Sequence, residues 1–392
     1  MADITLLATA DWDHPIWTNK QHVAVSLARQ GHKVLYVDSL GLRGLRAQAS
    51  DWRRVVRRIR RGFCPPRQVA PGLWVHTPLV WPGARGRTLT AVNRVLLQVG
   101  LAWARFCLRL RCDWLWTYNP RTLACLDVSA YRQVIYHSVD HIQSQPGMDP
   151  TDLDRWEALL CRRASIVFVT SPALADRLRP LNPEVHYFPN VADHAHFAAA
   201  LDPGTQLPGL LTEIPKPRVG FIGAISAYKL DLNLLEQLAT ARPDWSFVLI
   251  GPVGEGDPAT DITALQRLSN VYFISSRLYA ELPAWLAGMD AAILPLQCNS
   301  YTDAMFPMKF FEYLAAGRPV VASSIRSLQP FADWAHLVAP CPDAFSLHLR
   351  SAMDEDSPAK RQERSAFASG FTYDRRTEQM LECVRAVEAC HD

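Results

Sequence analysis

Short apolar runs recur along the first 200 residues, and polar or amphipathic segments separate them. The runs lie at 4–8, 33–38, 113–117, 133–136, 165–170 and 185–188. Each has the length and the β-branched or aromatic content typical of a buried strand. A helical pattern after the first run extends through Gln30, and Gly31 is expected to stop it. A strand, a helix and a second strand at this spacing predict a βαβ unit.

The same alternation begins again at residue 218. Apolar runs at 218–222, 245–250, 271–274 and 291–296 predict strands, Asp231 is placed to cap the helix after the first of them, and a short helix is expected over 282–287. Residues 201–217 are rich in Pro and Gly, as interdomain linkers are. We therefore expect an α/β fold with two domains, 1–200 and 218–371, joined by that linker. The last segment, 372–392, carries a helix expected from Asp374 to about Val387.

Residues 301–323, YTDAMFPMKFFEYLAAGRPVVAS, combine a loop, a short helix, a tight turn and a buried strand. Pro307 suits the first helical position, and Gly317 suits the left-handed cap that ends a helix. Lys309 and Glu312 are three residues apart, so their side chains share one helix face. A lysine in the first turn favours a phosphate, and a carboxylate one turn later can accept two hydrogen bonds from a vicinal diol. The stretch therefore predicts a site for a phosphate followed by a ribose.

The alternative for this stretch is an ordinary surface Glu–Lys pair, which is common on amphipathic helices. The position of the helix favours ligand binding instead. It follows the apolar run 291–296, so its amino terminus is expected at the carboxyl end of the sheet, where open α/β sheets bind their ligands.

Polar and aromatic residues also follow two predicted strands of the first domain. The loop after the first strand contains Asp11, Trp12, Asp13, His14 and Trp17. These side chains would suit a sugar or a lipid headgroup, or would simply form a structured loop. The loop has no glycine, so the fingerprint G-x-G-x-x-G is absent, which argues against a nicotinamide or flavin enzyme. Asp140 follows the run 133–136, flanked by His137 and His141, and is either a general base or a helix cap.

Residues 51–63, DWRRVVRRIRRGF, form a basic amphipathic segment. Its apolar positions are Trp52, Val55, Val56, Ile59 and Phe63, and its basic positions are Arg53, Arg54, Arg57, Arg58 and Arg61. This pattern predicts a helix in the interface of an anionic membrane. The alternatives are a helix packed on the protein core and a nucleic-acid contact, and we expect the membrane and no nucleic acid. Residues 89–110, rich in Leu, Trp and Arg, are a second candidate for the same surface.

Composition and charge are consistent with this organisation. The chain has 392 residues, enough for two domains with separate cores, and 49% of them are hydrophobic. Residues 1–111 contain 18 Lys and Arg against 5 Asp and Glu, a balance of +13, whereas the remainder contains 23 against 33, a balance of −10. Such asymmetry suggests that one half meets an anionic partner.

The nine cysteines are scattered and form no C-x-x-C pair, and the chain has no basic, signal-like start. These features predict reduced thiols in the cytoplasm and no zinc site. No cofactor is expected. No apolar run reaches the length of a membrane-spanning helix. A protein of this kind is expected to be peripheral on the inner face of the cell membrane.

Along nearly the whole chain, the order of these pieces resembles a bacterial glycosyltransferase with the GT-B fold. The string 307–321 resembles the nucleotide-binding signature P-x-K-x-x-E-Y-x-A-x-G-x-P-V-V of that family. The chain looks most like enzymes of exopolysaccharide and teichuronic acid assembly, and is more distantly similar to the xanthan glucuronosyltransferase. The resemblance implies two Rossmann-like domains that face a central cleft, with the last helix returning to the first domain.

The resemblance also implies roles for single residues. Ser138 and Asp140 match an S-x-D motif, which makes Asp140 the expected general base of an inverting transfer. The expected donor-binding residues are Gly223, Ser226, Lys229, Gly251, Tyr301, Asp303, Met308, Lys309 and Glu312. The expected acceptor-binding residues are Asp11, Trp12, His14, Trp17 and His137. Retaining relatives have two glutamates eight residues apart, but here Ala304 stands eight residues before Glu312, which favours inversion. Those relatives also hold the diphosphate with an Arg and a Lys after the Gly-rich turn, where this chain has only Lys229.

Sugar transfer needs a base near the attacking oxygen and positive charge near the leaving diphosphate. Asp140 and Lys309 would supply these groups, and no metal is required. The function expected is transfer from a nucleotide sugar, UDP-linked in the first instance, to a saccharide or lipid-linked saccharide. The alternatives are a non-catalytic protein that only binds nucleotide sugar, and a nucleotide-sugar epimerase.

Overall fold

The computed structural model describes residues 1–14, 17–40, 61–62, 64–81 and 86–391. The chain divides into two compact units. The first contains residues 1–170, 174–188 and 377–392, and the second contains 171–173 and 189–376. Most of the predicted amphipathic helix at 51–63 lies outside the described residues.

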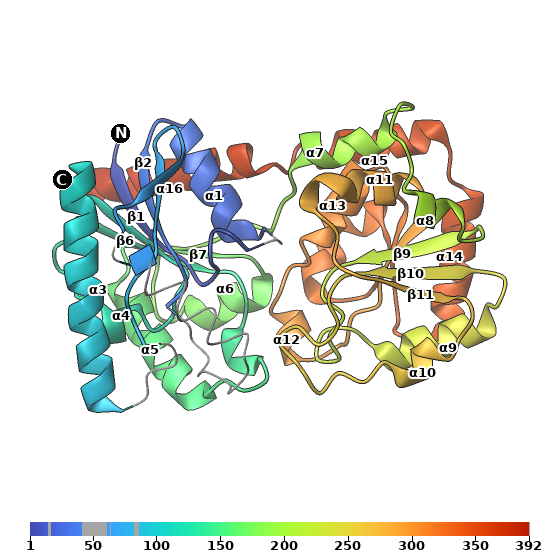
Figure 1. Cartoon of the computed structure of the whole chain (residues 1–392), viewed down its shortest axis with the longest axis horizontal. Helices are drawn as coiled ribbons and strands as arrows, with labels where there is room; N and C mark the ends of the chain where they lie inside the picture. Colours follow the sequence, from blue (N-terminus) through green and yellow to red (C-terminus); the bar gives the residue numbers. More distant parts are fainter. Residues whose placement is uncertain (15–16, 41–60, 63, 82–85, 392) are drawn as a thin grey trace. The chain divides into compact units, whose positions relative to one another are not determined.

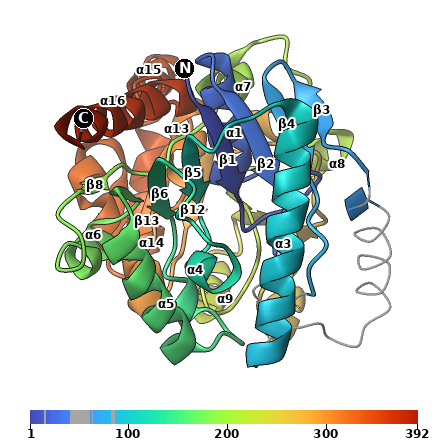
Figure 2. The ribbon, with the colours of Figure 1, turned by 90° about the vertical axis from the view of Figure 1, so that its left-hand side faces the viewer.

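The first unit is built on an eight-stranded sheet, in the order β3-β4-β2-β1-β5-β6-β7-β8 (Figures 1 and 2). The strands are β1 Asp3–Leu7, β2 Lys33–Val37, β3 Arg67–Ala70, β4 Leu73–His76, β5 Trp114–Thr117, β6 Gln133–Ser138, β7 Ile166–Val169 and β8 Val185–Tyr187. All pairs are parallel except β3 with β4. The hairpin of β3 and β4 was not predicted, because β3 is short and largely exposed.

The helices of the first unit are α1 Asn19–Arg29, α3 Arg87–Leu108, α4 Thr122–Cys125, α5 Pro150–Arg163, α6 Pro172–Leu178 and, from residue 377, most of α16 Tyr373–His391. The short 3-10 helix η1, Ile142–Ser144, follows β6. Helix α1 ends as predicted, with Gly31 at φ +89° directly after its cap. Helix α5 begins at Pro150, and the Asp149 side chain accepts a hydrogen bond from the Asp152 amide.

The second unit has a six-stranded parallel sheet in the order β11-β10-β9-β12-β13-β14. Its strands are β9 Arg218–Ile222, β10 Ser246–Ile250, β11 Val271–Ile274, β12 Ala291–Leu294, β13 Val320–Ser323 and β14 His336–Val338. This is the strand order of the dinucleotide-binding α/β fold. The predicted fold class, α/β with two Rossmann-like parallel-sheet domains, is therefore confirmed.

Helices cover both faces of this second sheet (Figure 1). The elements are α7 His194–Ala198, η2 Ala199–Leu201, α8 Gly209–Thr212, α9 Leu232–Ala241, α10 Thr263–Gln266, η3 Tyr279–Glu281, α11 Leu282–Ala287, α12 Ser300–Asp303, α13 Lys309–Ala315, η4 Arg326–Trp334, α14 Pro342–Asp354 and α15 Pro358–Ala368. Helix α13 packs against α7 and α15, whereas α14 packs against α9. Asp231 caps α9 as predicted, because its side chain accepts a hydrogen bond from the Leu234 amide at 2.9 Å.

The predicted linker 201–217 lies within the second unit instead of between the two units. Leu211 and Ile214 from this segment are buried in the core of that unit. Pro and Gly correctly indicated irregular backbone, but Leu211 and Ile214 anchor that backbone in the core of the second unit. The last helix, α16, begins at Tyr373, and residues 377–392 belong to the first unit.

Candidate functional site

The reversal of strand order in the second sheet lies between β9 and β12, and ligands of such sheets bind outside the carboxyl ends of the strands at this point. The loop after β9 starts at Gly223, and the segment after β12 leads into α12 and then α13. The sequence-predicted donor residues Gly223, Lys229, Tyr301 and Lys309 all belong to these connections. The topology therefore brings them to one end of one sheet.

Two glycines hold the loops after β9 and β10 in close contact. A Cβ atom on Gly251 would lie 2.0 Å from the carbonyl oxygen of Gly223, and Gly251 has φ +146°. The contact continues along both loops, because the Ile225 amide donates to the Pro252 carbonyl and the Gly254 amide donates to the Ile225 carbonyl, each at 2.9 Å. Gly251 thus acts by permitting the close approach of backbones, a role that the sequence did not distinguish from ligand contact.

Lys229 is held beside two tyrosine rings. Its Nζ lies 5.0 Å from the ring centroid of Tyr228 and 5.7 Å from that of Tyr301, and the two rings meet edge to face at 5.0 Å. The Asn299 side chain also donates to the Tyr228 carbonyl at 3.1 Å. This arrangement ties the loop after β9 to the start of α12 and places a cation at the carboxyl end of the sheet.

Helix α13 presents Lys309 and Glu312 as an ion pair. Lys309 Nζ donates to Glu312 Oε2 at 2.7 Å, and the lysine side chain is 22% exposed while the glutamate side chain is 5% exposed. The Lys309 chain also passes close to Gly223, since its Cε would lie 3.8 Å from a Cβ built there. The predicted shared face of the two residues is therefore present, and Lys309 reaches the loop after β9.

Hydrogen bonds at Tyr313 and at the carboxyl end of α13 fix the helix face that carries Lys309 and Glu312. The Tyr313 hydroxyl accepts a hydrogen bond from the Ile222 amide at 2.8 Å, which fixes the helix to the last residue of β9. Gly317, at φ +72°, donates to the Leu314 carbonyl, and Arg318 donates to the Tyr313 carbonyl, as in a Schellman cap. The cap agrees with the prediction, but α13 begins at Lys309, two residues later than Pro307. Tyr313 belongs to the nucleotide-binding signature, but its hydrogen bond with β9 could be seen only in the structure.

Tyr279, from η3, is a further neighbour of this carboxylate that the sequence analysis missed. Burial, followed by the negative charge of Glu312, raises the pKa of Tyr279 above its ordinary value. Its ring stacks on His196 at 4.2 Å. No local pattern marks it, because only the fold brings η3 to α13.

The other predicted donor residues have mixed surroundings. Ser226 is fully buried, and its hydroxyl donates to the Glu255 carbonyl at 2.7 Å, so it holds the loop and is not available to a ligand. This corrects its predicted role. Asp303 is exposed at the end of α12, and Met308 is half-buried directly before α13.

In the first unit, Asp140 lies two residues beyond β6 and is half-buried. Its carbonyl accepts a hydrogen bond from the Ile142 amide at 2.9 Å, in the turn that leads into η1. The cap of η1 is His141, and no side-chain cap bond is made there. The geometry thus does not support the helix-cap alternative for Asp140.

His137 does not reach the surface, which corrects its predicted contact with the acceptor. It is fully buried within β6 and stacks on Tyr118 with the ring centroids 4.8 Å apart. His137 is thus buried within the sheet, whereas Asp140, two residues beyond the strand, is half-buried.

The aromatic loop after β1 is a packed structure with a polar rim. Trp12 is buried against Tyr36 and Trp17, with centroids 5.1 and 5.0 Å away, and its amide donates to Asp38 Oδ1 at 2.8 Å. Asp11, His14 and Trp17 remain half-buried. Three of the four loop residues predicted to bind acceptor are therefore reachable at the carboxyl end of β1, while Trp12 supports the loop from inside.

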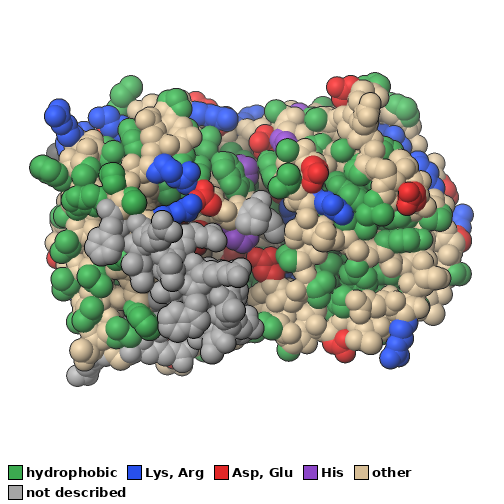
Figure 3. All heavy atoms as spheres, viewed as in Figure 1, with side chains coloured by type: hydrophobic (Ala, Val, Ile, Leu, Met, Phe, Trp, Pro, Cys, Tyr) green, Lys and Arg blue, Asp and Glu red, His purple; other side chains and the backbone are tan. Residues whose placement is uncertain are grey.

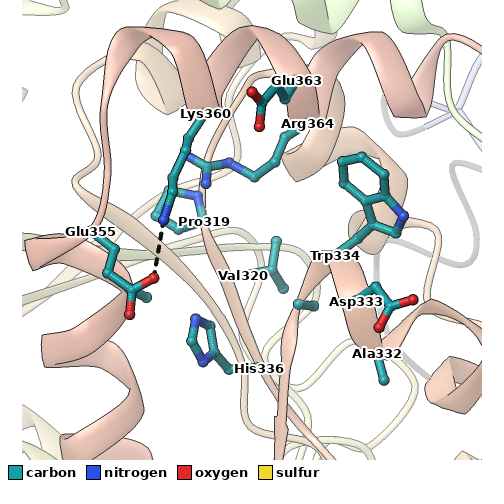
Figure 4. Close-up of a pocket in the computed structure, with 12 residues that line it drawn as sticks. Pro319, Val320, Ala332, Asp333, Trp334, His336, Glu355, Lys360, Glu363 and Arg364 are labelled. Carbon is teal, nitrogen blue, oxygen red and sulfur yellow. Dashed lines mark hydrogen bonds and ion pairs between the residues drawn. The ribbon is translucent and has the colours of Figure 1, made fainter.

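A cavity of the second unit lies away from the predicted donor-binding residues (Figure 4). It has a volume of about 310 Å³ and is lined by residues that include Pro319, Trp334, His336, Lys360 and Arg364. Pro319 and His336 stand at the amino ends of β13 and β14, opposite the end that carries Lys309. None of the predicted site residues lines it. Among the described residues, no group of three or more His, Cys, Asp or Glu side chains is placed to hold a metal ion.

Helix α3 carries an unusual exposed apolar stripe. Val92, Val95, Leu96, Val99, Trp103 and Phe106 recur at helical spacing and are all exposed, Val99 by 63% and Phe106 by 83%. Asn93, Leu97, Leu101 and Ala104 form the opposite, buried face. Hydrophobic side chains gather on the surface over α3 at the left of the view (Figure 3). None of the helices in the described ranges is long and apolar enough to cross a membrane.

Comparison with known proteins connects the second unit to a family. Residues 216–354 match the family described as glycosyl transferases group 1. A segment of 110 residues is 38% identical to the "Putative teichuronic acid biosynthesis glycosyltransferase TuaH" of Bacillus subtilis (strain 168). That segment spans 28% of this chain and 27% of the relative.

Solved structures match over nearly the whole chain. Sucrose-phosphate synthase from Thermosynechococcus elongatus has a TM-score of 0.71 at 16% identity, with all of both chains covered. Anabaena Alr3699/HepE in complex with UDP-glucose has a TM-score of 0.67 at 15% identity, with 98% of this chain and all of that chain covered. These structural matches confirm the predicted GT-B fold. The predicted resemblance to glycosyltransferases is confirmed in sequence for residues 216–354 and for the 110-residue segment shared with the teichuronic acid relative.

Proposed function

We propose that this GT-B chain, whose residues 216–354 form a group 1 glycosyl transferase domain, transfers a sugar from a nucleotide-sugar donor to a saccharide or lipid-linked saccharide. The observation that carries the proposal is the Lys309–Glu312 pair, which α13 holds beside Gly223 at the switch point of the second sheet. A UDP-sugar is the proposed donor, by analogy with the structurally similar HepE, which was solved in complex with UDP-glucose.

In this proposal each unit supplies one half of the chemistry. Lys309 and Lys229 would stabilise the charge that develops on the leaving diphosphate, and Glu312 would bind the ribose hydroxyls. These two lysines supply the positive charge, so the proposed transfer is metal-independent. Asp140 would take the proton from the attacking hydroxyl, which gives inversion at the anomeric carbon. Asp11, His14 and Trp17 would contact the acceptor.

The first test is binding, followed by turnover. UDP, GDP, CDP and dTDP are compared by thermal shift, and the sugar form of the best binder is then assayed for transfer to lipid-linked saccharide extracted from membranes. Binding without any turnover would support the non-catalytic alternative. Conversion of the donor sugar with no transfer would support the epimerase.

Replacing Glu312 by Ala is expected to weaken UDP binding roughly ten- to a hundredfold, because one charge-assisted contact worth about 1.5–3 kcal/mol is lost. Calorimetry with UDP and with pyrophosphate separates the two halves of the site. Glu312→Ala should weaken UDP more than pyrophosphate, whereas Lys309→Ala should weaken both. Glu363→Ala, an exposed carboxylate on α15, is the control. Unchanged UDP affinity in Glu312→Ala would refute the ribose assignment.

We also propose that the chain works as a peripheral protein on an anionic membrane at the cytoplasmic face, with α3 as the contact. The exposed stripe supplies apolar area, Arg94 and Arg109 are exposed nearby, and residues 87–108 contain neither Asp nor Glu. An apolar face bordered by arginine is typical of helices that lie in a lipid interface.

Changing Val95, Val99 and Phe106 together to Ser is expected to lower partitioning onto phosphatidylglycerol vesicles by at least about tenfold. Burying an apolar side chain of this size contributes about 1.5 kcal/mol or more. Vesicle sedimentation measures the change, and added salt should weaken binding further because of the arginines. Leu347→Ser, at a 67% exposed leucine of α14, is the matched control. Unchanged sedimentation, or a monomer–dimer equilibrium abolished by the triple change, would point to a protein partner instead.

A further inference from the structure

A buried carboxylate, Glu157 of α5, is the centre of a polar network below the turn that contains Asp140. Glu157 is 1% exposed. Its Oε1 accepts hydrogen bonds from the Tyr136 hydroxyl at 2.5 Å and the Ser138 hydroxyl at 3.4 Å. Its Oε2 accepts from the Gln143 side-chain amide and from Arg177 Nη2, the latter at 2.6 Å. Three neutral donors and one guanidinium therefore converge on one carboxylate.

These partners lie on both sides of Asp140 in sequence. Tyr136 and Ser138 end β6 before the turn, and Gln143 belongs to η1 after it. The Glu157 side chain thus holds the residues on both sides of 139–142. A second bond fixes the start of the turn, because the Thr170 hydroxyl donates to the Val139 carbonyl at 2.8 Å.

We propose that Glu157, compensated by Arg177, is the positioning residue that fixes the orientation of the Asp140 turn. The inference rests on the proposed role of Asp140 as base. Glu157 is itself buried below the turn and acts through the backbone that carries Asp140.

The composition of the network supports a positioning role over simple packing. Replacing a buried ion pair by apolar side chains is often neutral or stabilising, so stability alone does not favour a charged group here. The charges of Glu157 and Arg177 also act on His141, which lies in the turn. Burial and Arg177 lower the pKa of His141, whereas Glu157 and Asp154 oppose that shift. His141 in turn shares a hydrogen bond with Ser144 at 2.6 Å.

The test compares Glu157→Gln with Asn182→Ala in the full-length protein. Asn182 is buried and donates to the carbonyls of Cys161 and Ala164 at the other end of α5, so its loss loosens the same helix away from the turn. Glu157→Gln should lower kcat for release of UDP from UDP-glucose about 10²-fold, the effect expected when a reacting group is misplaced by about 1 Å. The KM for the donor should stay unchanged. Asn182→Ala should lower Tm while leaving kcat unchanged.

Two further measurements test the inference in addition to the kcat of Glu157→Gln. Gln143→Ala removes only the donor after the turn, so it should fold normally and lower kcat about tenfold. The NMR titration of the His141 ring does not need activity, and its pKa should fall in Glu157→Gln but not in Asn182→Ala. If wild-type protein releases no UDP, the proposed function fails, while the titration still tests whether the Glu157 charge reaches the turn. An unmoved His141 in Glu157→Gln, or equal losses of kcat in Glu157→Gln and Asn182→Ala, would overturn the inference.

Discussion

Asp140→Asn is expected to lower turnover by about 10²–10⁴-fold, the usual contribution of a general base, while UDP affinity stays unchanged. The substitution keeps the shape of the side chain and removes its basicity. Donor affinity should persist because the proposed nucleotide-binding residues belong to the second unit and Asp140 belongs to the first. Turnover and UDP calorimetry on the same preparations measure both quantities.

His137 and His141 are the rival bases, and substitution combined with pH dependence separates them. A base loses activity as the pH falls through its pKa, so the acid limb of the pH profile should disappear only when the true base is replaced. We expect Asp140→Asn to remove that limb and His137→Gln to leave it. His137→Gln should lower stability, since that ring is fully buried against Tyr118, but should leave kcat nearly unchanged in the folded fraction. Normal turnover of Asp140→Asn would show that the base is elsewhere. Retention of anomeric configuration in the product would refute inversion separately.

Gly251→Ala is expected to damage both the stability of the second unit and its affinity for UDP. The added Cβ would lie 2.0 Å from the Gly223 carbonyl oxygen, which is backbone and cannot rotate away. Overpacking and a backbone conformation unfavourable to alanine cost about 1–3 kcal/mol each. Relief of the clash must move the loop after β9, and with it the surroundings of Lys309.

Thermal unfolding and UDP calorimetry would report the two effects of Gly251→Ala. Gly209→Ala is the matched control, because a Cβ there meets nothing within 4 Å. This control should change the free energy of unfolding by no more than about 0.5 kcal/mol. Wild-type Tm together with wild-type UDP affinity in Gly251→Ala would show that the two loops are not in the close contact described.

The strands that could be predicted from the sequence are those marked by a local run of apolar residues. The apolar runs that became β1, β2, β9 and β12 have strong strand character, and each was placed to within two residues. The short strands β3, β4 and β14 were missed. Each has only three or four residues, and pairing makes them strands, β3 with β4, β4 with β2 and β14 with β13.

The residues of the candidate site fall into the same two groups, those that a local sequence pattern predicts and those that only the fold brings together. Lys309, Glu312 and the cap at Gly317 lie within nine residues, so spacing alone predicted their shared face. Tyr279 and Glu157 could not be found this way, because their partners come from separate elements. Ser226 and His137 were misjudged for a related reason: a polar residue after or within a strand can point inward, and only the packed structure shows that both are fully buried.

Helix α16 passes from one unit into the other between Arg376 and Thr377. At its far end, the Trp114 indole donates to Glu388 Oε1 at 2.9 Å, and Trp114 opens β5 of the first unit. The first unit is therefore completed by residues that are translated after the whole of the second unit. Neither unit can be produced whole by cutting the gene at a single point, and a stop codon between codons 377 and 388 would remove part of the unit to which residues 1–170 belong.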